Sequence, residues 1–181
     1  PKTNSYDGWD LDRWEQYIRD LVVFGTNAIE LIPPRSDDDA ASPHFPRPPM
    51  EMMVGMSKLA DDYGLDVWIW YPAMDADYAA PQTVEFALRE WDEVFKRLPR
   101  IDAVFVPGGD PGHTRPVHLM ALLEKQTESL HRRHPKATMW VSPQSFNGER
   151  YEEFLSLLRK RPSWLSGVVF GPQVRVGLQE L

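Results

Sequence analysis

The stretch Val67-Trp68-Ile69-Trp70-Tyr71-Pro72 is a short run of β-branched and aromatic residues that ends in proline. Four other runs of the same kind occur along the chain, at 28–33, 103–107, 138–143 and 168–172. The prolines that end the five runs are residues 33, 72, 107, 143 and 172, so the pattern returns every 29 to 39 residues. A period in this range is typical of a repeated structural unit.

The residues in these runs are mostly apolar on both faces, which is typical of strands buried on both sides of a parallel sheet. Proline lacks the N–H that a sheet hydrogen bond needs, so we expect it to end each strand. Between the runs, apolar residues recur with helical spacing at 10–24, 49–63, 82–98, 116–134 and 148–160. Strict alternation of helices and strands predicts one parallel sheet with right-handed crossovers and sequential strand order.

Two architectures contain such an alternation, an open doubly wound sheet and a (β/α)8 barrel. The nearly uniform period and the shared proline ending favour the barrel, and no glycine-rich phosphate-binding turn follows the first strand. We therefore predict an α/β fold of the parallel (β/α)8 TIM-barrel type, incomplete, with about five βα units in a single domain over 1–181. The expected piece runs from the first helix to the sixth strand of a barrel, and its open sheet edges favour self-association.

Composition and charge exclude several classes of protein. The 181 residues carry a net charge of −7, which argues against nucleic acid or an anionic membrane as the partner, since both attract basic surfaces. No apolar run in the sequence approaches the ~20 residues of a membrane-spanning helix. The absence of cysteine excludes disulfides, thiolate catalysis and cysteine-bound metals, and it leaves the compartment undetermined. We expect neither a metal nor a cofactor.

Candidate functional residues lie directly after the prolines, because ligands of parallel α/β folds bind beyond the carboxyl ends of the strands. Such segments here combine polar side chains with aromatic ones, which suits a sugar, since carboxylates and amides bond its hydroxyls and an indole packs on its C–H face. We assign Asp110 and Asp75 as catalytic residues. The candidate substrate-binding residues are Glu30, Arg35, Trp70, Asp77, His113, Trp140, Gln144, Asn147, Gln173 and Arg175.

The segment Pro107-Gly108-Gly109-Asp110-Pro111-Gly112-His113 is the most unusual of the five. Its glycines permit positive φ and close approach of the backbone, and its prolines stiffen the loop, which is more than a simple turn requires. We interpret Asp110 as a general acid or base, or as a group that orients the substrate. Together with His113 it would supply only half of a metal site, and no third ligand is evident in the sequence.

Other features have a structural interpretation that stays open beside the functional one. Asp37, Asp38 and Asp39 are typical of a solvated turn. Asp75 and Asp77 are also of a residue type that commonly forms turns. For the tryptophans on the strands, Trp68, Trp70 and Trp140, packing inside the barrel is favoured over a platform for a sugar.

The stretch 9–34 resembles the barrel opening of glycoside hydrolases, because a helix that ends at Phe24-Gly25-Thr26-Asn27 leads into a strand at Ala28-Ile29-Glu30-Leu31. As an architecture, the chain is most similar to the α-glucuronidase and β-N-acetylhexosaminidase-like barrel superfamily. This resemblance implies an acid after the fourth barrel strand, a place that Asp110 occupies when one strand precedes the chain. The hexosaminidase type has two adjacent acidic residues there, whereas this chain has Asp110 alone.

A two-carboxylate mechanism then needs a second acid, which Glu30, Asp75 or Asp77, or strands outside this chain, would supply. We therefore expect a carbohydrate-active barrel that hydrolyses a glycosidic bond in an oligosaccharide or a uronic-acid glycoside by carboxylate acid/base catalysis. A catalytically silent carbohydrate-binding barrel is the first alternative. The second alternative is a lyase or isomerase barrel that acts on a small acid held by Arg35 and Arg175.

Overall fold

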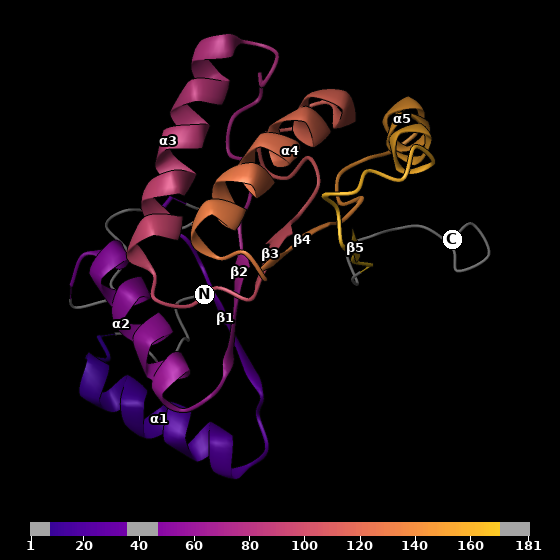
Figure 1. Ribbon diagram of the computed structural model, residues 1–181. Coiled ribbons are helices and arrows are strands. Elements are labelled where there is room, and N and C mark those ends of the chain that lie inside the picture. The colour runs from indigo at the N-terminus through magenta and orange to yellow at the C-terminus, as the bar shows by residue number, and fades with distance from the viewer. Residues whose placement is uncertain (1–7, 36–46, 171–181) are drawn as a thin grey trace.

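The computed structural model describes residues 8–35 and 47–170, in which helices and strands alternate as the repeat predicts (Figure 1). The helices are α1 (Leu11–Val23), α2 (Pro49–Asp62), α3 (Pro81–Arg97), α4 (Pro116–Arg133) and α5 (Glu149–Leu158). The strands are β1 (Ala28–Leu31), β2 (Asp66–Trp70), β3 (Ala103–Val106), β4 (Thr138–Val141) and β5 (Gly167–Val168). The end of the fifth predicted run, at 171 and 172, lies outside the described residues.

The strands form one parallel sheet in the order β1-β2-β3-β4-β5, which confirms the predicted topology. The register places Glu30 beside Trp68 on β1 and β2, and Trp70 beside Phe105 on β2 and β3. Because the strands are parallel and in sequential order, their carboxyl ends lie along one edge of the sheet. The loops that follow β1 to β4 therefore begin side by side.

Each strand divides its side chains between two environments, since successive side chains point to opposite faces. Val67 and Ile69 of β2 are fully buried in the hydrophobic core shared with the helices, whereas Trp68 between them is 39% exposed. Figure 1 shows α2, α3 and α4 along one side of the strands. The opposite surface, which we call the aromatic face, carries the half-buried or exposed rings of Trp68, Trp70, Phe105 and Trp140.

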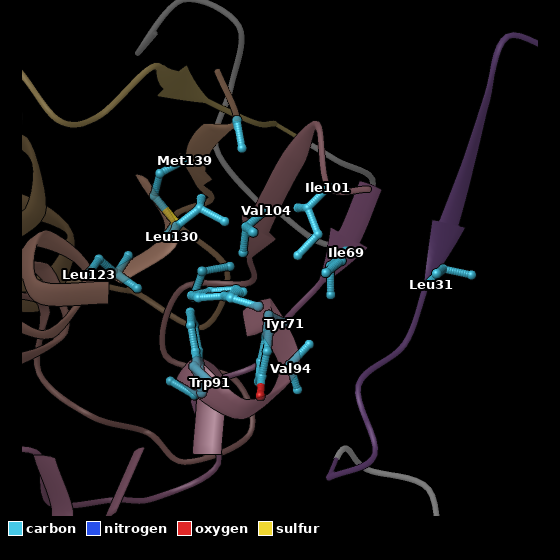
Figure 2. Packing of buried hydrophobic residues seen from close by; sticks show 14 of the residues in the cluster. Leu31, Ile69, Tyr71, Trp91, Val94, Ile101, Val104, Leu123, Leu130 and Met139 are labelled. Atoms are coloured by element: carbon cyan, nitrogen blue, oxygen red, sulfur yellow. The ribbon is translucent and has the colours of Figure 1, made fainter. Parts of the chain in front are cut away.

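An aromatic stack joins the end of β2 to α3. The ring of Tyr71, directly after β2, stacks on Trp91 of α3 with a centroid separation of 3.8 Å and an interplanar angle of 22°. Phe95 meets both rings edge-on. Figure 2 shows Tyr71 and Trp91 together within the core. The stack fixes the point from which the loop after β2 leaves the sheet.

The helix ends follow the signals in the sequence. Asp10 caps α1, since its carboxylate accepts a hydrogen bond from the backbone N–H of Arg13 at 2.9 Å. Proline occupies the first turn of α2, α3 and α4, where its missing N–H costs no helical hydrogen bond. None of the described helices combines the length and the apolar character that crossing a bilayer requires.

An ion cluster joins elements at the opposite edge of the sheet. Arg100 lies before β3 and donates to Asp66 at the start of β2 and to Asp102. Asp102 in turn accepts a hydrogen bond from the backbone N–H of Val67 at 2.8 Å. Because this edge holds the amino ends of the strands, we assign the cluster to stability of the fold.

Candidate functional site

Three neighbouring loops, which follow β2, β3 and β4, are joined by backbone contacts at the carboxyl edge of the sheet. Ala73 and Pro111 form a parallel bridge, and the N–H of Gly112 donates to the carbonyl of Ala73 at 3.3 Å. On the other side, the N–H of Gly109 donates to the carbonyl of Gln144 at 3.0 Å. The loop after β3 therefore lies between its two neighbours and is held by both.

Glycine is required at two points of the loop after β3 because neighbouring backbone lies so close. Gly108 has a φ of +58°, and a Cβ there would overlap the carbonyl oxygens of Ser142 and Gln144. At Gly112, a Cβ would overlap the carbonyl oxygens of Ala73 and Asp75. The glycines that made this segment unusual in the sequence thus have a packing role as well as any functional one.

Replacing Gly112 with alanine is expected to destabilise the protein by about 1–3 kcal/mol, the usual cost of forcing an extra carbon into a packed site. The new Cβ meets backbone rather than a flexible side chain, so the loop after β2 must move. Urea unfolding of both proteins measures the effect as a shift of the midpoint. An unchanged midpoint would show that the two loops are not in contact.

Asp110 is held by one of its two carboxylate oxygens. The side-chain amide of Gln144 donates to Oδ2 of Asp110 at 2.8 Å. Among the described residues, no hydrogen bond or ion pair involves Oδ1. The carboxylate is half-buried, in a loop that continues into Pro111. This arrangement fixes the side chain and leaves one oxygen for a ligand.

His113 and Asn147 lie in turns that Arg150 connects. The Nη1 of Arg150 donates to the carbonyl of His113 at 2.7 Å, and its backbone N–H donates to the carbonyl of Asn147 at 3.1 Å. His113 and Asn147 are exposed, and the backbone of His113 has a φ of +56°. Both side chains are therefore accessible from solvent near the Asp110 loop.

Asp75 belongs to a second group of polar side chains, built around Arg35. The Nη2 of Arg35 donates to Oδ2 of Asp75 at 2.7 Å, and its Nε lies 3.5 Å from Glu90 Oε1 on α3. The hydroxyl of Tyr78 donates to the same Oδ2 at 3.2 Å and accepts from the N–H of Asp75 at 3.1 Å. The guanidinium also lies 5.1 Å from the ring centroid of Phe86. These contacts connect the segment that follows β1, where Arg35 lies, to the loop that follows β2 and to α3.

Burial raises the pKa of Glu90 from its usual value of 4.5, while the charge of Arg35 acts in the opposite direction. Burial likewise raises the pKa of the Tyr78 hydroxyl, so Tyr78 acts as a neutral hydrogen-bonding group beside Asp75. The sequence analysis did not identify either residue. The short distance in sequence between Tyr78 and Asp75 is a weak signal that the two side chains contact each other. Nothing in the helical pattern of α3 indicates that Glu90 lies near Arg35.

We expect Glu90→Gln to stabilise the protein relative to wild type at neutral pH, with the difference disappearing toward pH 4. The raised pKa means that the folded state binds the Glu90 proton more tightly than the unfolded state, so this contribution to wild-type stability falls as pH rises above about 4.5. Unfolding free energies at several pH values measure the difference. Glu85→Gln, on an exposed position of α3, is the matched control for loss of one charge. A Glu90→Gln variant that is less stable than wild type at pH 7 would show that the ion pair with Arg35 outweighs burial.

The aromatic face is formed by the strands β2, β3 and β4, from whose carboxyl ends these loops leave. Trp68 meets Phe105 edge-on with centroids 5.3 Å apart, and Phe105 lies 6.0 Å from Trp140. The indole N–H of Trp140 donates to the hydroxyl of Thr138 at 2.9 Å. Glu30 is next to Trp68 in the register, and desolvation raises the pKa of its carboxyl group.

The remaining candidates divide into a turn residue and residues outside the described part. Asp77 accepts from the N–H of Ala79 at 3.1 Å, which is the pattern of an aspartate-capped turn. The proposed binding residues Gln173 and Arg175, and the acidic segment 37–39, lie outside the described residues. Within 8–35 and 47–170, no three His, Asp or Glu side chains are grouped as a metal site requires.

No protein-family model matches this chain, and no curated protein matches it either. The solved structures to which it is similar include two that share 14% sequence identity with it. β-Glucuronidase 3 of Bacteroides uniformis has a TM-score of 0.50, and the match covers 81% of this chain and 17% of that one. GH5_18 of Streptomyces cattleya, solved in complex with GlcNAc, has a TM-score of 0.54, with 79% and 42% covered.

The similarity to these structures establishes the fold. At the level of the fold, it confirms the predicted resemblance to barrel glycoside hydrolases. The five parallel strands and their helices have the α/β architecture of part of a TIM barrel. The chain spans less than half the length of either similar protein. In a complete barrel, the aromatic face would point inward and the three joined loops would lie at the rim that carries active sites.

Proposed function

We propose that the protein is carbohydrate-active and hydrolyses a glycosidic bond with Asp110 as the general acid. The observation that carries this proposal is the Asp110 carboxylate itself. It stands in the middle of three joined loops, is held through Oδ2 by Gln144, and keeps Oδ1 unbound among the described residues. Fold-level similarity to glycoside hydrolases supports the same reading by analogy.

In this mechanism, protonated Asp110 donates its proton to the glycosidic oxygen while the bond from that oxygen to the anomeric carbon breaks. A second carboxylate then attacks the anomeric carbon or activates the water that does so, and the leaving sugar departs as an alcohol. Asp75 is the proposed partner, because its loop packs directly against the Asp110 loop at Ala73 and Gly112. Arg35 and Tyr78 would hold it in position.

The ligand is proposed to be a sugar because the face below Asp110 is lined with aromatic rings. Trp70 and Trp140 would pack on the C–H face of a sugar ring, and Gln144, Asn147 and His113 would bond its hydroxyls. An oligosaccharide or a uronic-acid glycoside fits this set. The proposed Gln173 and Arg175 contacts remain predictions from the sequence.

A catalytically silent carbohydrate-binding barrel is the second candidate function. The observation that favours it is the Arg35–Asp75 ion pair at 2.7 Å, which occupies the proposed partner carboxylate and leaves Asp110 as a lone acid. The lyase or isomerase alternative is weakened by the same contact. Arg35 already binds Asp75 and lies near Glu90, so it is not free to hold the carboxylate of a small acid.

A panel of 4-nitrophenyl α- and β-glycosides, including the glucuronides, tests the proposal in the full-length protein. Release of nitrophenolate from at least one glycoside is expected. Saturable binding of an oligosaccharide without release from any glycoside would instead support the binding barrel. Activity that appears only with a small hydroxy acid would favour the lyase or isomerase.

A further inference from the structure

We propose that Glu90 is a positioning residue, which keeps one oxygen of Asp75 available for reaction by engaging the guanidinium of Arg35. Without the Glu90 carboxylate, Arg35 would turn and bind both oxygens of Asp75. This role rests on the proposed function, in which Asp75 is the second carboxylate. It adds a residue that contacts neither the substrate nor the bond that breaks.

The first support is that Arg35 divides its nitrogens between two carboxylates. Its Nη2 donates to Oδ2 of Asp75 at 2.7 Å, whereas its Nε lies 3.5 Å from Oε1 of Glu90. Arginine commonly binds a carboxylate through two parallel hydrogen bonds, which for Asp75 would use Nε and Nη2 together. Since Nε faces Glu90 instead, Arg35 holds Asp75 by a single oxygen.

The second support is that the contacts of the Asp75 carboxylate converge on that oxygen. Besides the Arg35 bond, Oδ2 accepts a hydrogen bond from the hydroxyl of Tyr78 at 3.2 Å. Among the described residues, no hydrogen bond reaches Oδ1. A carboxylate held in this way has a fixed direction and still presents one oxygen, as a nucleophile or a general base requires.

The third support is that Glu90 occupies a position where a charge is unfavourable. Its side chain is 23% exposed, compared with 31% for Arg35 and 33% for Asp75. Burial raises the pKa of Glu90 from its usual value of 4.5, and the attraction of Arg35 offsets this effect only in part. A glutamate that lowers stability at neutral pH indicates a role other than stability.

The same contact should respond to pH, because protonation of Glu90 releases Arg35. The other ionisable groups of this cluster are the Tyr71 and Tyr78 hydroxyls, whose pKa burial raises, so they stay neutral. Helix α4 packs on α3 but directs the charge of Arg132 to a different carboxylate, at 3.3 Å. As pH falls toward about 4.5, wild-type turnover should therefore approach that of Glu90→Gln.

A double-mutant cycle of Glu90→Gln and Arg35→Lys tests the role in the full-length protein, on a glycoside that the wild type hydrolyses. Glu90→Gln should lower kcat by at least about tenfold and leave KM nearly unchanged, since a charge-assisted hydrogen bond must break before Asp75 reacts. Lysine cannot form two parallel bonds, so Glu90→Gln should have little effect in the Arg35→Lys background. Glu85→Gln, at an exposed position of α3, is the matched control and should keep the wild-type rate.

Unfolding of the same preparations separates positioning from a structural role. Glu90→Gln should lower turnover without lowering stability at neutral pH. A parallel loss of stability and turnover would overturn the proposal, as would an unchanged kcat or an equal loss in both backgrounds.

A crystal structure of the Glu90→Gln protein tests the contact without turnover. We expect Nε and Nη2 of Arg35 to bind the two oxygens of Asp75. An Arg35 that still binds Asp75 through Nη2 alone would overturn the proposal. A wild type that hydrolyses no glycoside would instead count against the proposed function, and the crystal structure would still decide what Glu90 does to Arg35.

Discussion

Asp110→Asn is expected to lower kcat/KM on a responsive glycoside by at least about 100-fold, because a general acid contributes ~10²–10⁴-fold to the rate. An asparagine side chain has nearly the same shape and still offers an oxygen to the Gln144 amide, which donates to Oδ2 at 2.8 Å in the wild type. The loop should therefore stay folded while the transferable proton is lost. Initial rates and thermal unfolding, measured on the same preparation, separate these two effects.

The control for this variant is Asp62→Asn, which removes an equal charge from the exposed end of α2. Among the residues that the structure describes, Asp62 pairs only with Lys58, at 2.9 Å, and it lies far along the chain from the joined loops. Its rate should equal that of the wild type. Normal turnover in the Asp110→Asn protein would exclude Asp110 from the chemistry, and the binding-barrel interpretation would then replace hydrolysis.

Trp91→Ala is expected to destabilise the protein by about 3–5 kcal/mol, the range for removal of a buried aromatic side chain. Trp91 is 2% exposed, stacks on Tyr71 at 3.8 Å and meets Phe95 edge-on. Its removal leaves a cavity between β2 and α3 that the sheet cannot close. For a chain of this size, the expected fall in Tm is about 10 °C. Chemical denaturation or calorimetry provides the measurement.

Phe86→Ala, on the exposed side of α3, is the control that shows whether the loss of stability in Trp91→Ala comes from burial of the ring rather than from a change in helix propensity. Phe86 is 45% exposed, so Phe86→Ala should cost no more than about 1 kcal/mol. Similar losses for Phe86→Ala and Trp91→Ala would mean that the stack on Tyr71 does not anchor α3. The stack also precedes the loop that carries Asp75, so Trp91→Ala should reduce turnover in addition to stability.

Part of the candidate site could be predicted because it follows from chain order alone. Parallel strands in sequential order bring their carboxyl ends to one edge, so the segments that follow Tyr71, Val106 and Val141 had to meet there. The glycines of the segment after β3 signalled a close approach, which the contacts at Gly108 and Gly112 now explain. Their neighbours could not be identified in advance, because the sequence does not show which carbonyls each glycine faces.

The sequence by itself determined the elements, the parallel sheet and the edge that carries the polar loops, because hydrophobic periodicity and proline position are local signals that repeat along the chain. Only the tertiary structure decided how the polar side chains pair. Arg35 binds Asp75 across 40 positions and Gln144 binds Asp110 across 34, and no local pattern specifies such contacts. Pairing depends on side-chain direction and distance in space, which are set when the loops pack against one another.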